Sequence, residues 1–181
     1  YESPSVLRNV RMRAPWLFVT WLAGLAASML IGVFEDQLTK TVALAAFIPV
    51  VLGMGGNVGS QTATIIVRGL ATGRVSSQLG VTYLLRETGI GLLLGLLYGV
   101  LLAVYAAIVH GDGSAVGLPL TVGLSIFLSM AISACVGATT PLIFNRLNID
   151  PAVATGPIVT TTVDVLGTLT YFLSAALIMG G

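Results

Sequence analysis

The sequence predicts an all-α integral membrane protein with five transmembrane helices. Of its 181 residues, 56% are hydrophobic and only 8% are charged. Soluble domains carry about 25% charged residues, so a water-soluble fold could not bury this much apolar surface. Five apolar stretches are long enough to cross a hydrocarbon core of about 30 Å, which takes roughly 20 helical residues. These stretches are Trp16–Phe34, Thr41–Val67, Thr88–Val109, Val116–Phe144 and Pro151–Met179.

The basic residues predict how the chain sits in the membrane. Seven arginines lie in the N-terminal segment and in the connections after the second and fourth stretches, whereas Lys40 alone lies on the other side. The positive-inside rule then places the N-terminus in the cytoplasm and the C-terminus outside the plasma (inner) membrane. We expect residues 1–15 to form a cytoplasmic juxtamembrane segment and residues 16–181 to form the transmembrane domain. No basic cluster is dense enough to predict a nucleic-acid partner.

The N-terminal segment has two interpretations. Its arginines satisfy the positive-inside rule, which favours a simple orientation signal. Alternatively, Val6, Leu7 and Val10 would form the apolar side of an amphipathic helix that couples to an upstream domain.

Asp164 is the only acidic or basic residue inside the five predicted stretches, and it is the fourteenth residue of the fifth. A carboxylate near the bilayer centre costs about 2.5–3.5 kcal/mol on insertion scales, so such groups face water or the interior of a bundle. A functional role is the favoured interpretation because intramembrane acids are rare. The alternative is a protonated or hydrogen-bonded Asp with a structural role between helices.

Small and polar residues accompany Asp164 at intervals of four: Gly156, Thr160 and Thr168. On a helix this spacing predicts one narrow stripe. Pro157 deprives the carbonyl of residue 153 of its helical donor, and Gly156 loosens the same turn. The sequence therefore predicts free backbone oxygens beside the carboxylate.

The chemistry of these groups predicts the class of ion. Carboxylate, hydroxyl, carbonyl and water oxygens suit Mg²⁺, Ca²⁺ or Mn²⁺, whereas zinc and copper prefer His and Cys. His110 falls in a polar turn and Cys135 stands alone, which argues against a soft-metal site. One carboxylate cannot neutralise a divalent cation, but a two-fold homodimer would bring two copies of Asp164 to its axis. Two acids and a ring of carbonyls would hold a largely hydrated ion.

The second stretch contains an unusual run, "VVLGMGGNVGSQTATI" (Val50–Ile65). A nucleotide-binding loop is excluded because the run lacks the G-x-x-x-x-G-K-[ST] and G-x-G-x-x-G patterns and lies at membrane depth. The polar residues in and after it fall within about 60° on a helix, in one stripe that consists of Asn57, Gln61, Thr64 and Arg68. Two interpretations of this stretch are compatible with each other: it packs against other helices, and it lines an aqueous path.

Glycines support both of these interpretations. Pro49 and the glycines at positions 53, 55, 56 and 59 predict irregular backbone, which membranes tolerate only inside protein or around a wet cavity. We expect them to let this stretch approach the fifth, with Gly53, Gly56, Asn57 and Gln61 lining the path between them. In the third stretch, by contrast, Gly91, Gly95 and Gly99 share their face with no polar residue, which predicts helix packing.

Four segments resemble the membrane domain of the MgtE family of magnesium channels and transporters, to which eukaryotic solute carriers are related. They are "FIPVVLGMGGNVGSQTATIIVRGLATG" (Phe47–Gly73), "LLRETGIGLLLGL" (Leu84–Leu96), "GATTPL" (Gly137–Leu142) and "IDPAVATGPIVTTTVDVLGTLTYF" (Ile149–Phe172). The resemblance covers nearly the whole chain in the right order, and the motifs of the second and fifth stretches are specific.

The resemblance implies a homodimer whose pore is lined mainly by the second and fifth stretches. It implies that Asp164 of both copies binds hydrated Mg²⁺ with help from the Thr160 backbone carbonyl. A second site near Gly156 is less secure, because some family members have Asn there. Full-length members carry cytoplasmic regulatory domains before a connecting helix, whose end would correspond to residues 1–15. Without such domains we expect weak gating or none.

We consider four classes of function: a channel, an exchanger, an intramembrane enzyme, and a structural or assembly module in which Asp164→Asn would be harmless. The favoured hypothesis is a passive channel for Mg²⁺, with Mn²⁺, Co²⁺ and Ca²⁺ as alternative ions. The second is a secondary exchanger that couples Mg²⁺ to Na⁺ or H⁺. An enzyme is not expected, because Asp164 has no partner carboxylate and no His is predicted at membrane depth.

Overall fold

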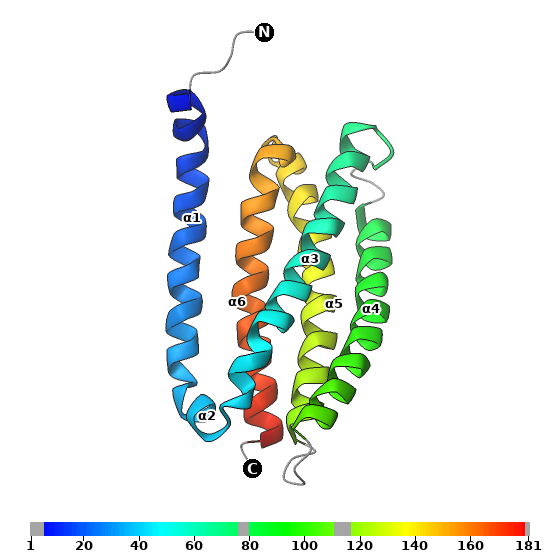
Figure 1. Ribbon diagram of the computed structural model, residues 1–181. Helices are drawn as coiled ribbons and strands as arrows, with labels where there is room; N and C mark the ends of the chain where they lie inside the picture. The colour runs from blue at the N-terminus through cyan, green and yellow to red at the C-terminus, as the bar shows by residue number, and fades with distance from the viewer. Residues whose placement is uncertain (1–5, 76–79, 111–116, 180–181) are drawn as a thin grey trace.

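The computed structural model describes residues 6–75, 80–110 and 117–179, which form six α-helices and no strand (Figure 1). Five of these helices are long and apolar enough to cross a membrane, which confirms the predicted fold class. The helices are α1 (Val6–Val33), α2 (Glu35–Lys40), α3 (Ala43–Ala71), α4 (Gly80–Val109), α5 (Gly117–Arg146) and α6 (Pro151–Met179). Residues 1–5, Val116 and residues 180–181, all part of the predicted segments, lie outside the described residues.

Two helices begin well before the apolar stretches that predicted them. Helix α4 begins at Gly80, eight residues before the predicted start at Thr88, and it includes Arg86 and Glu87. Arg and Glu are good helix formers, so the helix continues where the apolar pattern stops. Helix α1 begins at Val6, and the described part of the N-terminal segment is therefore continuous with the first span.

The expectation of irregular backbone in the second span is wrong. Helix α3 runs unbroken from Ala43 to Ala71 and contains Pro49 in its second turn. The glycines of one face replace side chains at close helix contacts rather than breaking the helix. A Cβ atom added at Gly55 would lie 2.5 Å from Ser129 Oγ, and one at Gly59 would lie 3.3 Å from the Ser133 carbonyl oxygen. These contacts hold the helix close against α5 and α6.

Helix α5 forms the centre of the bundle and packs against α3, α4 and α6 (Figure 1). Its contact with α4 is backbone to backbone. Cβ atoms added at Gly95 and Gly99 would each lie 2.7 Å from a carbonyl oxygen of α5, and one at Gly91 would lie 2.9 Å from another. The predicted packing role of this glycine face is therefore confirmed.

Helix α1 stands at the side of the bundle, where it packs along α6 (Figure 1). At the far end from the N-terminus, the rings of Phe34 and Phe172 stack with their centroids 5.0 Å apart. Beside them the Tyr171 hydroxyl, which is buried, donates a hydrogen bond of 2.7 Å to the Leu44 carbonyl oxygen. This cluster joins α1, α3 and α6 at one end of the bundle.

Candidate functional site

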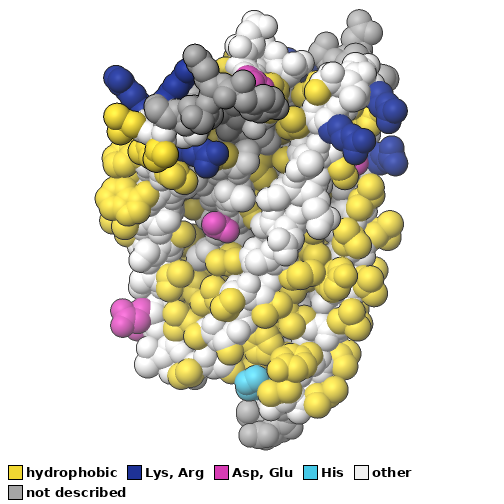
Figure 2. Space-filling view, turned by 45° about the horizontal axis from the view of Figure 1, so that its top comes forward, with side chains coloured by type: hydrophobic (Ala, Val, Ile, Leu, Met, Phe, Trp, Pro, Cys, Tyr) yellow, Lys and Arg dark blue, Asp and Glu magenta, His cyan; other side chains and the backbone are white. Residues whose placement is uncertain are grey.

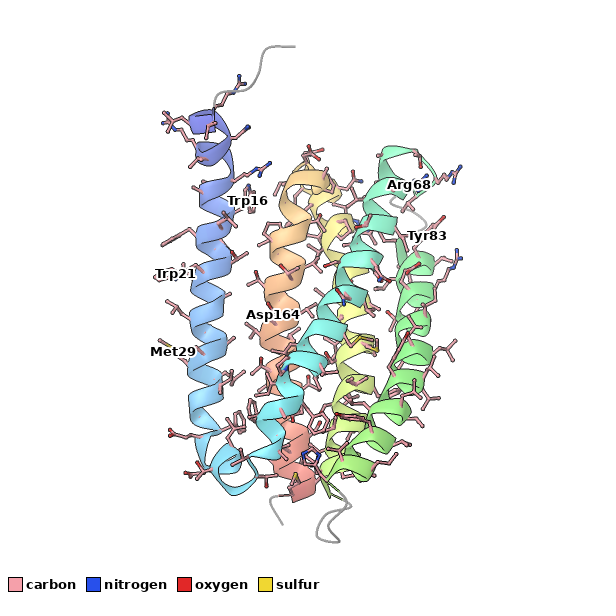
Figure 3. The ribbon with its side chains drawn as sticks, viewed as in Figure 1. Trp16, Trp21, Met29, Arg68, Tyr83 and Asp164 are labelled. Atoms are coloured by element: carbon pink, nitrogen blue, oxygen red, sulfur yellow. The ribbon has the colours of Figure 1, made fainter. Side chains whose placement is uncertain are left out.

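Asp164 lies at the midpoint of α6, which is 29 residues long, and its side chain is exposed in the single copy of the chain (Figure 3). Gly156 is also exposed, and Thr160 is half-buried. Thr168 departs from the predicted stripe because it is only 1% exposed. Each step of four residues turns a helix by about 40° beyond a full circle, so three steps rotate Thr168 by about 120° into the core. The stripe therefore consists of Gly156, Thr160 and Asp164.

Threonine hydroxyls along α6 donate to the backbone of the preceding turn. The Thr160 hydroxyl lies 3.1 Å from the carbonyl oxygens of both Gly156 and Pro157, and the Thr168 hydroxyl donates to the Asp164 carbonyl oxygen at 2.7 Å. A hydroxyl whose proton points back to the helix presents its lone pairs outward. At the half-buried Thr160, this arrangement adds a hydroxyl oxygen to the oxygen ligands available near Asp164.

The polar stripe of α3 is exposed along its whole length. Asn57, Gln61, Thr64 and Arg68 all lie on the surface of the single copy. Gly53 and Gly56 lie beside this stripe, and a Cβ atom at either would meet no atom within 4 Å. The four glycines of the run therefore divide into two pairs, because Gly55 and Gly59 are buried against neighbouring helices whereas Gly53 and Gly56 face open space.

Helices α3 and α6 lie against each other, as expected for the second and fifth spans. A Cβ atom at Gly59 would lie 3.2 Å from both Val159 Cγ1 and Val163 Cγ2. Towards the Arg68 end the two helices diverge around a groove of about 350 Å³. Thr64, Arg68 and Gly156 line this groove. The Thr155 hydroxyl, which also lines it, is buried without a hydrogen-bond partner in the described part of the chain.

Charged groups are distributed unevenly over the face shown in Figure 2. Lys and Arg side chains gather at one end, and the middle of the face is mostly apolar (Figure 2). Among the residues that the structure describes, no group of three or more His, Cys, Asp or Glu side chains is placed to hold a metal ion. The candidate oxygen ligands of a single copy are therefore those of Asp164 and of the hydroxyl and carbonyl groups near it.

Sequence reasoning missed a buried carboxylate, that of Glu87. Glu87 is only 5% exposed and lies on the face of α4 that packs against α5. It directly precedes the predicted third stretch, Thr88–Val109, and therefore falls outside it. Its spacing is the signal that would have found it, since Glu87, Gly91, Gly95 and Gly99 recur at intervals of four.

Comparisons with known proteins identify several similar proteins. A family model described as MgtE, divalent cation transporter, matches residues 48–174. The magnesium transporter MgtE of Thermus thermophilus is 40% identical over 167 residues, which cover 92% of this chain and 36% of that protein. Its counterpart in Bacillus subtilis is 37% identical over 88% of this chain and 35% of that protein. That of Enterococcus faecalis is 28% identical over 98% of this chain and 38% of that protein. The chain thus spans a little over a third of the length of these relatives.

Proposed function

This chain belongs to the MgtE family of divalent cation transporters, and we propose from that premise that it is a passive channel for hydrated Mg²⁺. The pore forms between two copies of the chain and is lined by α3 and α6. The names of the relatives supply the ion, since each of the three is a magnesium transporter.

The observation that carries this proposal is the exposure of Asp164 at the midpoint of α6. A carboxylate at that depth cannot face hydrocarbon without a penalty of several kcal/mol, so it must face water or protein. The exposed amides of Asn57 and Gln61 on α3 must also face water or protein, because polar groups at membrane depth need hydrogen-bond partners from protein or from a wet cavity. A second copy placed over these surfaces encloses them around a water-filled path.

The roles of the residues follow from ion chemistry. Two copies of Asp164 supply two negative charges opposite a doubly charged ion. Mg²⁺ sheds its water reluctantly, so these carboxylates and the Thr160 carbonyl oxygens act on the hydrated ion. Gly156, which lines the groove between α3 and α6, forms a weaker second site on the same path. Binding that is firm but incomplete lets the ion both enter and leave.

The membrane potential supplies the driving force. An interior-negative potential of 100 mV contributes about 2.3 kcal/mol per charge, so about 4.6 kcal/mol for a divalent cation. This energy supports roughly a thousandfold accumulation without a coupled ion. A Na⁺ or H⁺ gradient is therefore not required. The orientation that fits uptake has the arginine-rich end in the cytoplasm.

The test is divalent-cation flux into liposomes that contain the purified protein. Asp164→Asn removes the charge while it keeps the size of the side chain, and we expect it to abolish Mg²⁺ flux. Asp36→Asn is the matched control, because Asp36 is exposed in α2 at the end of the bundle, away from the proposed ion site. It is expected to conduct as the wild type does. Flux at the wild-type rate in Asp164→Asn would exclude the proposed site.

Two further measurements define the ion selectivity and the transport mode. Parallel assays with Mg²⁺, Ca²⁺ and Mn²⁺ establish which ion the site prefers. In planar bilayers, we expect currents that persist without a Na⁺ or H⁺ gradient. Currents that vanish when that gradient is removed would instead establish the exchanger.

A further inference from the structure

A second pocket lies at the arginine-rich end of the bundle, between the end of α3 and the beginning of α4. Its volume is about 330 Å³, which is near the lower limit of the roughly 300–1,000 Å³ of ligand pockets. Arg68, Arg74 and Tyr83 line it together with apolar and small residues of α3 and the following turn. Both arginines are exposed. Within the described residues, neither guanidinium has a carboxylate partner.

The turn after α3 fixes the position of Arg74. Gly73 takes the left-handed conformation with φ of 68°, and the backbone N–H groups of Arg74 and Val75 both donate to the Gly69 carbonyl oxygen, at 2.9 and 3.0 Å. The Val75 side chain is buried and packs against Gly69. A Cβ atom added at Gly69 would collide with the Val75 side chain. The Tyr83 hydroxyl lies 3.5 Å from the Arg74 carbonyl oxygen. The backbone that carries Arg74 is therefore held before any ligand arrives.

The donors that remain free identify the class of ligand. The backbone N–H groups of this turn, from Thr72 to Val75, are already bonded to carbonyl oxygens, and the Thr72 hydroxyl donates to the Arg68 carbonyl oxygen. The guanidinium groups of Arg68 and Arg74 are therefore the principal donors that face a ligand. Guanidinium groups present paired N–H donors that match the oxygens of a phosphate, and pairs of this kind are strong and directional. The pocket thus suits a phosphate monoester or diester.

Its position in the fold identifies the source of that phosphate. Ile65, which also lines the pocket, is 53% exposed and lies one turn closer to the middle of the bundle than the arginines. The acyl chain of a lipid can cover the Ile65 side chain while the head group of the same lipid reaches Arg68 and Arg74, which lie nearer the end of the bundle. Basic pockets between transmembrane helices on the cytoplasmic side commonly bind anionic lipid head groups. We propose that this pocket binds the head group of an anionic phospholipid through Arg68 and Arg74.

A bound phosphate has a consequence for the ion path. Arg68 lines both this pocket and the groove between α3 and α6. A lipid phosphate that engages its guanidinium offsets a positive charge at the mouth of that groove, and cation entry becomes faster. This consequence rests on the proposed function, whereas the binding of the lipid does not.

The binding test uses the purified protein in neutral detergent, titrated with phosphatidylglycerol or phosphatidylcholine, with bound lipid counted by native mass spectrometry. The variant is Arg74→Gln, because Arg74 lines the lipid pocket but not the groove between α3 and α6, whereas Arg68 lines both. The matched control is Arg146→Gln, which removes the same charge from an exposed residue in the last turn of α5. We expect phosphatidylglycerol to bind in preference to phosphatidylcholine, and about tenfold more weakly to Arg74→Gln, the effect of one lost charge-assisted contact. Arg146→Gln is expected to bind as the wild type does.

Three outcomes would overturn parts of this proposal. Equal weakening in both variants would show attraction to net charge rather than a pocket. If inorganic phosphate displaced bound phosphatidylglycerol as effectively as added phosphatidylglycerol does, the pocket would be assigned to a soluble phosphate compound. Flux is measured separately, in vesicles with and without phosphatidylglycerol, and we expect Arg74→Gln to reduce the stimulation by this lipid more than Arg146→Gln does. Lipid binding without that difference would refute the effect on ion entry and leave the binding site intact.

Discussion

Replacing Gly95 by alanine tests the close backbone contact between α4 and α5. A Cβ atom at this position would lie 2.7 Å from the Phe127 carbonyl oxygen and 3.0 Å from its Cα atom. Both are backbone atoms, so no side chain can rotate away to make room. Ordinary contacts begin at 3.4 Å, and α4 must therefore move from α5 by about 3.4 − 2.7 = 0.7 Å.

The cost of that movement follows from the neighbouring contacts. Gly91 and Gly99 lie one turn on either side, and Cβ atoms added there would also lie 2.9 and 2.7 Å from carbonyl oxygens of α5. A gap of about 0.5–1 Å forfeits a quarter to a half of the dispersion energy of each separated pair. Overpacking of this kind costs about 1–3 kcal/mol. Alanine returns about 1 kcal/mol through its helix propensity, so the net loss is smaller than the overpacking cost.

A matched variant separates these two contributions. Gly89 lies on the same helix, and a Cβ atom there would meet nothing within 4 Å. Gly89→Ala therefore gains the helix propensity without the overpacking, and the difference between the two variants is about 1–3 kcal/mol. At about 2–4 °C per kcal/mol, Gly95→Ala should unfold about 2–12 °C below Gly89→Ala when both are heated in one detergent and followed by size-exclusion chromatography. Equal unfolding temperatures for the two variants would refute the backbone contact between α4 and α5.

Two further predictions concern the ends and the open face of α3. Tyr171→Phe removes the hydrogen bond to the Leu44 carbonyl oxygen and should lower stability by about 0.5–2 kcal/mol in the same heating assay. An unchanged unfolding temperature would mean that this carbonyl finds another donor. Gln61→Leu should leave the unfolding temperature unchanged, because the side chain is exposed, but should lower Mg²⁺ flux into liposomes. Normal flux would instead make the stripe of α3 a packing surface.

The sequence predicts the number and order of the spans because hydropathy alone determines which segments can cross a bilayer. It also predicts that Gly91, Gly95 and Gly99 share a packing face, since a spacing of four places them on one side of a helix. The buried carboxylate of Glu87 was missed because hydropathy marks the boundary of the apolar stretch, at Thr88, rather than the first residue of the helix, Gly80. Packing against α5 continues the helix for two turns beyond the apolar pattern.

The candidate site shows where sequence spacing loses its accuracy. Gly156, Thr160 and Asp164 stay together on α6, but Thr168 turns into the core because the drift of about 40° per step accumulates. On α6 the stripe read from a spacing of four therefore holds over two steps and fails at the third, whereas on α4 Glu87, Gly91, Gly95 and Gly99 stay buried over three steps. On α3 the polar stripe alternates steps of four and three, so its drift cancels and all four residues, including Arg68, remain exposed.

The four glycines of the run Val50–Ile65 explain how one helix serves both the bundle and the proposed path. Gly55 and Asn57 are separated by about 160° around the helix axis, so the face that packs and the polar face are nearly opposite. On the packing side, Gly55 and Gly59 let the backbone approach α5 and α6, while the methyl-free surface at Gly53 and Gly56 leaves space beside the polar stripe. A helix with larger residues at all four positions would both stand away from the bundle and narrow the path. The run that weakens the intrinsic helix propensity thus strengthens tertiary contacts on one side and leaves open space beside the proposed path on the other.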